Sequence, residues 1–270
     1  MYIIEQMLKK IILVLWIASS VSLSADVIRL KAFDFDDGHH QFYFNLLETA
    51  LSDMGHELEL ELYSNVPQKR IEFILDNDEE SYIHFFIQTE ERDERWNTIN
   101  LGLTNSLIAH RVLFIPRGKQ SVYNDIGNLD DFRSKGLIGA FGANWYDIDV
   151  WKFNDLNFYA KDGDWRTIYR MLSMGNRNID YFSRGVTEIL GEATLYPQLD
   201  IEEKLLFIYS RDFHLYFTES VELKYRSIIE EALLNGKKRG LIDKLIRKYY
   251  SEDFDRLNFD NRIRIYLDTP

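Results

Sequence analysis

The sequence of 270 residues contains no cysteine and only four prolines. Without cysteine the chain has no disulfide framework, so its stability must come from a hydrophobic core, although it tolerates an oxidising compartment. With so few prolines there is no proline-rich linker between domains. Hydrophobic residues make up 46% of the chain and aromatic residues 14%, which is the composition of a globular protein rather than a disordered one.

Positive charge is also scarce. The chain has 32 lysines and arginines against 44 aspartates and glutamates, which gives a formal net charge of −12. An acidic surface repels phosphate groups, so we expect no nucleic-acid partner and no binding to anionic lipid.

The first 25 residues have the three parts of a secretory signal peptide. Lys9 and Lys10 precede the apolar run 11–21, and small residues lead to a cleavage site after Ala25. The run is shorter than the stretch of about 20 apolar residues that spans a bilayer. We therefore predict that residues 1–25 are removed on export and that the mature chain is periplasmic. No cysteine follows the cleavage site to carry a lipid, and the alternative is a retained membrane anchor.

Short apolar runs alternate with amphipathic stretches after the signal, which predicts two α/β blocks. In the first block the predicted strands and helices are 27–30, 40–54, 56–62, 67–75 and 82–87. In the second block and the C-terminal segment, the predicted strands are 107–115, 137–141, 179–182, 205–209 and 214–217. The predicted helices there are 128–134, a helix that begins at about residue 145, 163–174, 186–195, 221–234 and 241–250. Strands separated by helices favour parallel pairing. Two such blocks are expected to face each other across a cleft at the carboxyl ends of their strands.

The order of these segments resembles the family 3 extracellular solute-binding proteins, the periplasmic receptors of polar amino acid uptake systems. The similarity covers about residues 27–250. It is carried by the Thr-Glu-Glu-Arg sequence at 89–92, the strand and glycine turn at 137–144, and the Phe-Ser-Arg-Gly-Val sequence at 182–186. The resemblance implies a type II periplasmic-binding-protein fold of α/β class, with two lobes joined by two crossing strands.

The resemblance also implies how the chain is divided and what it does. Lobe 1 is expected in two pieces, residues 26–114 and 207–270 with the C-terminal helices, and lobe 2 in residues 115–206. The lobes would close on a small-molecule ligand and pass it to the membrane permease of an ABC-type transporter or to a sensor partner. No catalytic group, cofactor or metal is implied, and we expect a monomer.

Candidate ligand-binding residues follow from the same resemblance. Arg92 matches the family position that holds the ligand carboxylate, and a guanidinium offers a planar bidentate fork to such a group. Arg95, three residues on, is the alternative. Gly142, Asn144 and Trp145 belong to a turn whose backbone amides match those that meet the same carboxylate. The alternative for this turn is a strand-to-helix connection with Asn144 as the N-cap.

The chain departs from the family pattern after the predicted strand 179–182. Family members carry an acidic residue there that holds the ligand ammonium group, whereas this chain has Arg184 followed by Gly185. An arginine repels an ammonium group and, together with Arg92, attracts an anion, so we predict an anionic or amino-acid-like ligand. The alternative is that Arg184 pairs with Glu188, one helical turn on.

The remaining candidates are aromatic or lie after the first strand. Phe35 and Asp37 are expected at the mouth of the cleft, and Trp145 and Tyr181 are expected to stack on the ligand. The histidines and carboxylates at 34–40 fit no ordinary metal loop, so we predict no metal. An enzyme on this scaffold is the competing class, but the chain has no cysteine and no supported Ser-His-Asp arrangement, so we expect no enzyme.

Overall fold

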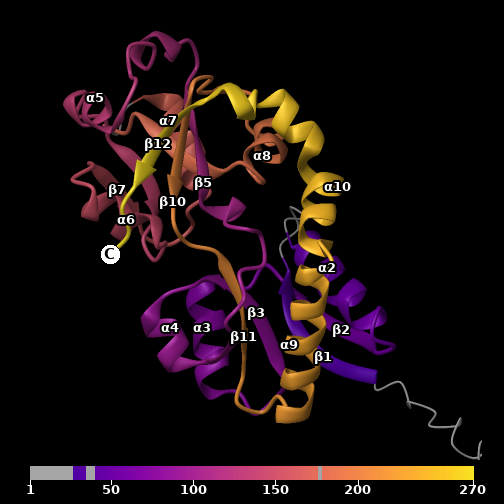
Figure 1. The fold of residues 1–270 in the computed structure, drawn as a ribbon. Helices are drawn as coiled ribbons and strands as arrows, with labels where there is room; N and C mark the ends of the chain where they lie inside the picture. The colour runs from indigo at the N-terminus through magenta and orange to yellow at the C-terminus, as the bar shows by residue number, and fades with distance from the viewer. Residues whose placement is uncertain (1–26, 35–39, 176–177) are drawn as a thin grey trace, which may run out of the picture.

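The computed structural model describes residues 27–34, 40–175 and 178–270, which form the two lobes drawn one above the other in Figure 1. These residues build two β-sheets, one in each lobe. Among them, no helix is long and apolar enough to cross a membrane. The predicted signal peptide and the site residues Phe35 and Asp37 lie outside the described residues.

Lobe 1 is built on the sheet whose strands are, in spatial order, β2 (Glu57–Ser64), β1 (Val27–Asp34), β3 (Tyr82–Ile87), β11 (Phe213–Phe217) and β4 (Asn97–Ile99). The helices of this lobe are α2 (Gln41–Ser52), α3 (Gln68–Asn77), α4 (Glu90–Arg95) and α9 (Leu223–Lys238). Strand β1 pairs in parallel with both β2 and β3, as the βαβ pattern of the sequence predicts.

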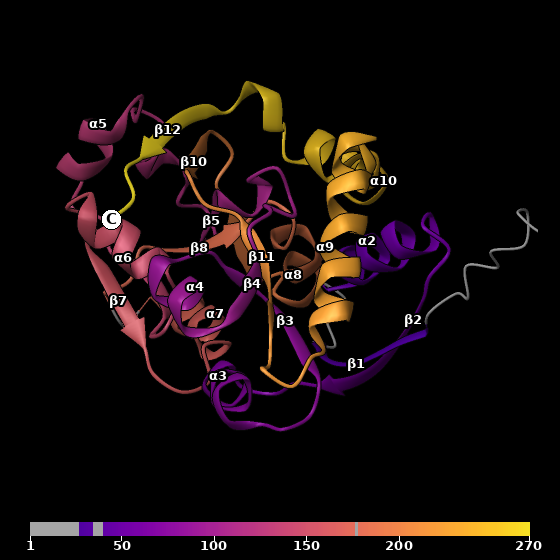
Figure 2. The ribbon, with the colours of Figure 1, turned by 60° about the horizontal axis from the view of Figure 1, so that its bottom comes forward.

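Strand β3 shows how the sheet of lobe 1 is covered on both faces. Ile83 and Phe85 pack into the core beneath α2 and α9, whereas Tyr82 and Phe86 pack on the opposite face with residues of α3. Because successive side chains of a strand point to opposite faces, a strand with both faces covered must be apolar along its length. Figure 2 shows α9 and α2 side by side on one face, with α3 on the other.

Lobe 2 is built on the sheet β12 (Ile263–Leu267), β10 (Leu205–Tyr209), β5 (His110–Pro116), β8 (Tyr181–Gly185), β6 (Gly139–Gly142) and β7 (Phe158–Lys161), with β9 (Leu199–Ile201) paired to β5. The helices of this lobe are α5 (Leu129–Ser134), α6 (Asp147–Phe153), α7 (Thr167–Met174) and α8 (Ile189–Leu195). In β5, Val112 and Phe114 face the core formed with α7 and α8, and Leu113 and Ile115 face the core formed with α5 and α6.

The chain passes between the sheets at residues 100–109 and 210–212, and Asp212 fastens these two crossings together. Its buried carboxylate accepts hydrogen bonds from the Thr104 hydroxyl at 2.6 Å and from the Ser106 amide at 2.8 Å. A Cβ atom at Gly102 would come within 2.5 Å of this carboxylate, so only glycine leaves room for it. The two crossings therefore behave as one connected unit.

The C-terminal residues correct the expected division of the chain. Residues 207–270 were expected in lobe 1, but β10 and β12 pair in parallel in the sheet of lobe 2. The change of lobe falls at the crossings 100–109 and 210–212 rather than after residues 114 and 206. The physical reason for the position of β12 is burial, because Ile265 and Leu267 lie in the lobe 2 core.

Helix α10 (Leu241–Arg256) forms a third link between the lobes. Leu241, Ile242 and Leu245 at its beginning are buried in the lobe 1 core, and Leu257 just after its end is buried in the lobe 2 core. Tyr250 packs against both cores. In Figure 1 the helix rises beside both lobes before the chain turns over the top of lobe 2 to β12.

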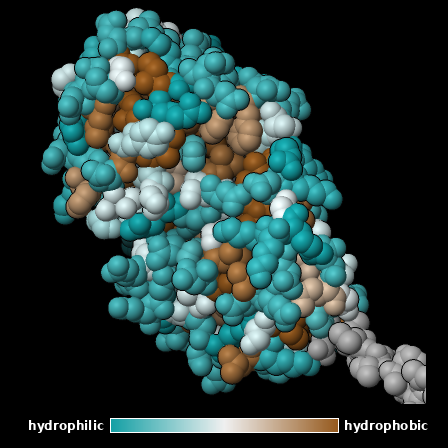
Figure 3. All heavy atoms as spheres, viewed as in Figure 1, coloured by the Kyte–Doolittle hydropathy of each residue, from teal (hydrophilic) through white to brown (hydrophobic). Residues whose placement is uncertain are grey.

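The surface of the protein is largely polar on the face seen in Figure 1. Figure 3 shows hydrophilic residues over most of this face and hydrophobic residues in small patches.

Strand β12 offers a test of its contribution to lobe 2. The Ile265→Ala variant should lower the free energy of unfolding by about 2–5 kcal/mol, because it removes a buried side chain and leaves a cavity. Tyr266→Ala on the opposite face of the same strand is the matched control, since Tyr266 is 67% exposed, and should change stability by about 0.5 kcal/mol or less. Urea denaturation of both variants checks this; equal effects would contradict the placement of β12.

Candidate ligand-binding cavity

A cavity of about 630 Å³ lies between the two lobes. Cavities of this size are in the usual range for small-molecule sites. Its lining from lobe 1 includes His40, Tyr43, Pro67, Gln68, His84, Phe85, Phe86 and Arg92. Its lining from lobe 2 and the crossing strands includes Arg111, Gly142, Asn144, Trp145, Asp147, Trp165, Arg184, Glu188 and Tyr209. The cavity lies at the carboxyl ends of β3 and β8, where the sequence predicts a cleft.

The lobes touch each other at the edge of this cavity. The Gln68 side chain donates a hydrogen bond of 3.4 Å to the backbone carbonyl of Asn144, and Lys69 Nζ lies 3.8 Å from Asp162 Oδ1. Lys69 and Asp162 are both largely exposed, so their pairing contributes little energy. These contacts nevertheless record a conformation in which the lobes have closed over one side of the cavity.

Arg92 presents its guanidinium to the cavity from lobe 1. The Thr89 side chain caps α4 by accepting from the Arg92 amide, which fixes the start of the helix that carries it. Arg92 Nη1 donates to the carbonyl of Ile87 at 2.7 Å, and the guanidinium lies 4.7 Å from the centre of the Phe86 ring. The ion pair with Glu72 spans 3.8 Å. Burial lowers the pKa of Arg92, with Glu72 opposing this effect, so its charge is only loosely compensated.

Arg95, the alternative carboxylate ligand, does not line the cavity. Its guanidinium forms a two-pronged interaction with Asp76, with Nε 2.8 Å from Oδ1, and lies over the Trp96 ring. Hydrogen bonding to Asp76 raises the pKa of Arg95. Of the two arginines, the structure therefore brings only Arg92 to the cavity.

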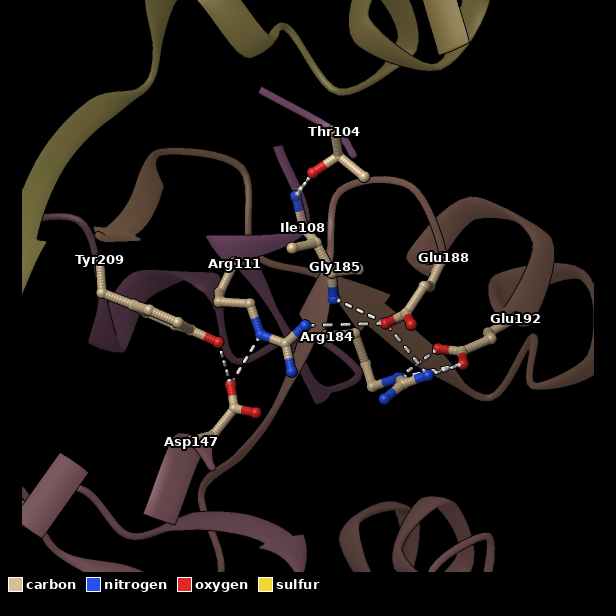
Figure 4. A network of polar contacts seen from close by, with 9 residues as sticks. All are labelled: Thr104, Ile108, Arg111, Asp147, Arg184, Gly185, Glu188, Glu192 and Tyr209. Atoms are coloured by element: carbon tan, nitrogen blue, oxygen red, sulfur yellow. Dashed lines mark hydrogen bonds and ion pairs between the residues drawn. The ribbon is translucent and has the colours of Figure 1, made fainter. Parts of the chain in front are cut away.

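Arg184 also reaches the cavity, but its charge is matched by carboxylates of its own lobe. Its guanidinium binds Glu192 through two nitrogens, with Nε 2.8 Å from Oε2, and lies 3.2 Å from Glu188 (Figure 4). It is also stacked against Trp145 and Trp165 at 4.9 and 4.8 Å. Burial alone would lower the pKa of Arg184, but Glu188 and Glu192 raise it well above its ordinary value.

Arg111 extends this network toward the crossing strands. Its Nε lies 2.8 Å from Asp147 Oδ1, which also accepts a hydrogen bond of 3.3 Å from the Tyr209 hydroxyl, and its Nη1 lies 3.8 Å from Glu188 (Figure 4). We call Arg111, Asp147, Arg184, Glu188 and Glu192 the lobe 2 charge cluster. Two guanidiniums meet three carboxylates in it. The prediction of an anionic ligand required an unmatched Arg184, and that condition is not met.

Glu188 lies close to Arg184 and Gly185, where the resemblance implies an acidic residue. Its Oε2 accepts a hydrogen bond of 3.0 Å from the Gly185 amide. The same oxygen would lie 3.0 Å from a Cβ atom placed on Gly185. The Glu188 carboxylate thus folds back over the glycine, and Glu188 lines the cavity. The sequence interpretation considered Glu188 only as a partner of Arg184. The spacing of three residues between Gly185 and Glu188 was the feature of the sequence that could have indicated their contact.

The turn of Gly142, Asn144 and Trp145 lines the cavity, but mainly as an aromatic surface. The Ala143 amide donates to the Lys161 carbonyl and the Trp145 amide to the Gly142 carbonyl, so both are already used within lobe 2. A Cβ atom on Gly142 would come within 2.6 Å of the Trp145 indole nitrogen, so glycine is required for the indole to lie there. Asn144 is exposed and is not the N-cap of α6, because Tyr146 holds that position without a side-chain hydrogen bond.

Tyr181 does not line the cavity, which corrects its expected role as a stacking residue. It is fully buried in the lobe 2 core, where its hydroxyl accepts a hydrogen bond of 2.7 Å from Trp151 Nε1. On β8 it points to the face opposite Phe182, so the alternation of the strand turns it away from the site. Trp165 supplies the second indole of the cavity instead.

Within the described ranges, no group of three or more histidine or carboxylate side chains is placed to hold a metal ion.

Comparisons with known proteins identify the fold. No family model matches the sequence, and no curated protein is similar to it by sequence. Among solved structures, an ancestral arginine-binding protein bound to arginine is similar with a TM-score of 0.55 and 15% identity, covering 83% of this chain and 98% of that chain. The AvGluR1 ligand-binding domain in complex with glutamate is similar with a TM-score of 0.58 and 16% identity, covering 86% and 98%.

A third similar structure is an amino acid ABC transporter substrate-binding protein from Streptococcus pneumoniae bound to L-arginine. Its TM-score is 0.53 at 14% identity, and the match covers 83% of this chain and 95% of that one. These similarities, together with the two sheets and their crossings, confirm the predicted type II periplasmic-binding-protein fold. At such low identity they are similarities of fold.

The lobe 2 charge cluster makes a prediction about stability. Arg184→Met should lower the free energy of unfolding by about 3–5 kcal/mol, because it leaves the buried Glu192 carboxylate without its guanidinium. Arg29→Met removes a similar two-pronged pair with Glu59 at an exposed site and should leave stability nearly unchanged. Denaturant titration of both variants measures the difference. A mild effect of Arg184→Met would show that Glu192 finds water or another partner.

Proposed function

We propose that this protein is an exported, periplasmic solute-binding protein that captures a small amino-acid-like solute by hinge closure and delivers it to an ABC-type permease. The observation that carries this proposal is the interlobe cavity, which has a loosely compensated cation, Arg92, on lobe 1 and carboxylates of the lobe 2 charge cluster on the other side. The similar structures that hold arginine or glutamate support an amino-acid-like ligand.

The distribution of charge favours a zwitterion over a simple anion. A carboxylate on the ligand would complete the environment of Arg92, whose pKa is lowered by burial. An ammonium group would lie against Glu188, the carboxylate that covers Gly185. A ligand that carries both groups would contact both lobes at once, and such a bridging ligand stabilises the closed conformation.

We further propose that the protein binds without chemical conversion. The similar structures are described as binding proteins or ligand-binding domains, which supports this class. A sensory role, in which the closed form signals to a membrane partner, uses the same cavity and the same closure. Uptake of radiolabelled solute by cells with and without the gene separates transport from sensing.

Export is tested by the mass of the protein. When the full chain is expressed in a Gram-negative host, the periplasmic extract should contain a form that begins at Asp26, because residues 1–25 have the parts of a cleavable signal. Intact mass spectrometry measures the loss of these residues. Retention of the full mass in the membrane fraction would favour the uncleaved anchor instead.

The role of Arg92 has a matched control three residues away. Arg92→Gln should weaken binding of the solute at least about 100-fold, since it removes a charge-assisted bidentate contact worth about 3 kcal/mol. Arg95→Gln, which changes an arginine bound to Asp76 outside the cavity, should leave affinity nearly unchanged. Native mass spectrometry of the purified protein identifies a co-purified solute, and calorimetric titration then gives both affinities. Equal loss in the two variants would contradict the role of Arg92.

A further inference from the structure

We propose that residues 241–267 form a strap that limits how far the two lobes can separate, so that the protein without solute keeps its cavity largely formed. This inference goes beyond the proposed function, because it concerns the empty protein and does not depend on which solute is bound. It begins from the third link between the lobes, which starts in lobe 1 as helix α10 and ends in lobe 2 as strand β12.

The first half of α10 is fixed to lobe 1. Leu241, Ile242 and Leu245 are buried in the lobe 1 core together with residues of α2 and α9. Tyr249 packs against Phe42 of α2, with 5.9 Å between the ring centres. Pulling this half of the helix away from lobe 1 would expose buried apolar surface to water, which is unfavourable. The beginning of the strap is therefore expected to move with lobe 1.

The other end of the strap is fixed to lobe 2. Strand β12 pairs in parallel with β10 from Ile263 to Leu267, and Ile265 and Leu267 are buried in the lobe 2 core. The Asn154 side chain adds two hydrogen bonds, since it donates to the Asp268 carbonyl at 2.8 Å and accepts from the Asp268 amide at 3.0 Å. This end is therefore expected to move with lobe 2.

Arg262 prevents the turn between α10 and β12 from lengthening. Its buried guanidinium donates to the carbonyl of Leu257, at the end of α10, at 2.7 Å and to the carbonyl of Leu205, in β10, at 2.9 Å. The fully buried Glu202 carboxylate lies 3.6 Å from the same guanidinium. An unattached turn could extend to about 3.5 Å per residue. Here such an extension would first have to break buried hydrogen bonds.

A strap of fixed length restricts a rotation that the two crossings alone would allow. Helix α10 lies to one side of β5, β10 and β11, the strands that adjoin the crossings (Figures 1 and 2). A rotation that opens the cavity must therefore bend α10 or pull one of its ends out of a core. Tyr250, in the middle of the strap, also lines the cavity. A protein whose binding-competent form is already populated loses little affinity to the conformational equilibrium, so the strap would favour binding.

The separation of the lobes is measured by double electron–electron resonance between two spin labels. The labels are placed at Lys69→Cys and Asp162→Cys, because these side chains face each other across the edge of the cavity and the chain has no cysteine of its own. The labelled full chain is unfolded and refolded before the measurement to remove any bound solute. Every variant carries the same label pair, so the loss of the Lys69–Asp162 ion pair is common to all of them.

The strap is then lengthened without removing either of its ends. About eight glycine and serine residues, a flexible span of roughly 15 Å, are inserted between Ser251 and Glu252, which are both exposed. The matched control carries the same insertion between Lys135 and Gly136, in an exposed turn that lies within lobe 2.

The wild-type and control proteins should give one narrow distribution of short distances, whereas the lengthened strap should add a population at longer distances, by up to about 15 Å. If the wild-type protein already shows the long distances, or if the lengthened strap leaves the distribution unchanged, the inference is wrong. Either result would leave the proposed function intact, because lobes joined by the two crossings alone can also close on a solute.

A pair of point variants decides the question should the lengthened strap fail to fold. Arg262→Lys keeps a positive charge beside Glu202 but replaces the guanidinium fork that donates to two carbonyls. Arg264→Lys is the control, since Arg264 is exposed and donates to the Asp260 carbonyl at 3.3 Å. Arg262→Lys should extend the distribution to longer distances and Arg264→Lys should not; equal distributions in the two variants would overturn the inference.

Discussion

The compensation of buried arginines by carboxylates of the same lobe is the constraint on which the rest of the site depends. Arg184 is held by Glu192 and Glu188, and Arg111 by Asp147. A guanidinium that is removed from water without such partners would be very costly. Because α6 and α8 bring the carboxylates to β5 and β8, the polar surface of lobe 2 is complete before any ligand arrives.

The hinge geometry determines how this surface can approach Arg92. Asp212 ties one crossing to the other through Thr104 and Ser106, so the two crossings share any rotation between the lobes. Helix α10 adds a further constraint, since Tyr250 contacts both cores and also lines the cavity. A rotation that opened the cavity would have to slide or bend this helix against at least one core, and packed cores resist gradual deformation.

Periodicity in the sequence was enough to predict the strands and helices whose pattern is local. The alternation of 56–62 and the apolar stripes of α2, α9 and α10 correspond to elements of the structure. Helix α4 contains no apolar residue, so hydrophobic periodicity gives no signal for it, and the structure shows that the Thr89 side chain caps it. Strand β12 alternates Ile263, Ile265 and Leu267, but no local pattern reveals that its partner is β10. The pairing of Arg184 with Glu188 was foreseeable from their spacing, whereas Glu192, Arg111 and Asp147 converge only through the tertiary fold.

Charge compensation within a lobe has a consequence for the coupling of binding to closure. If Arg92 found its counter-charge in lobe 2, the empty protein would close on itself and a ligand would gain little by entering. Instead Arg92 is paired only loosely with Glu72 of its own lobe, and the carboxylates of lobe 2 are bound to Arg111 and Arg184. A ligand shifts a conformational equilibrium only by its difference in affinity for the two states. Under the proposed function, that difference would come from a guest with both signs of charge, which would contact Arg92 on lobe 1 and Glu188 on lobe 2 simultaneously.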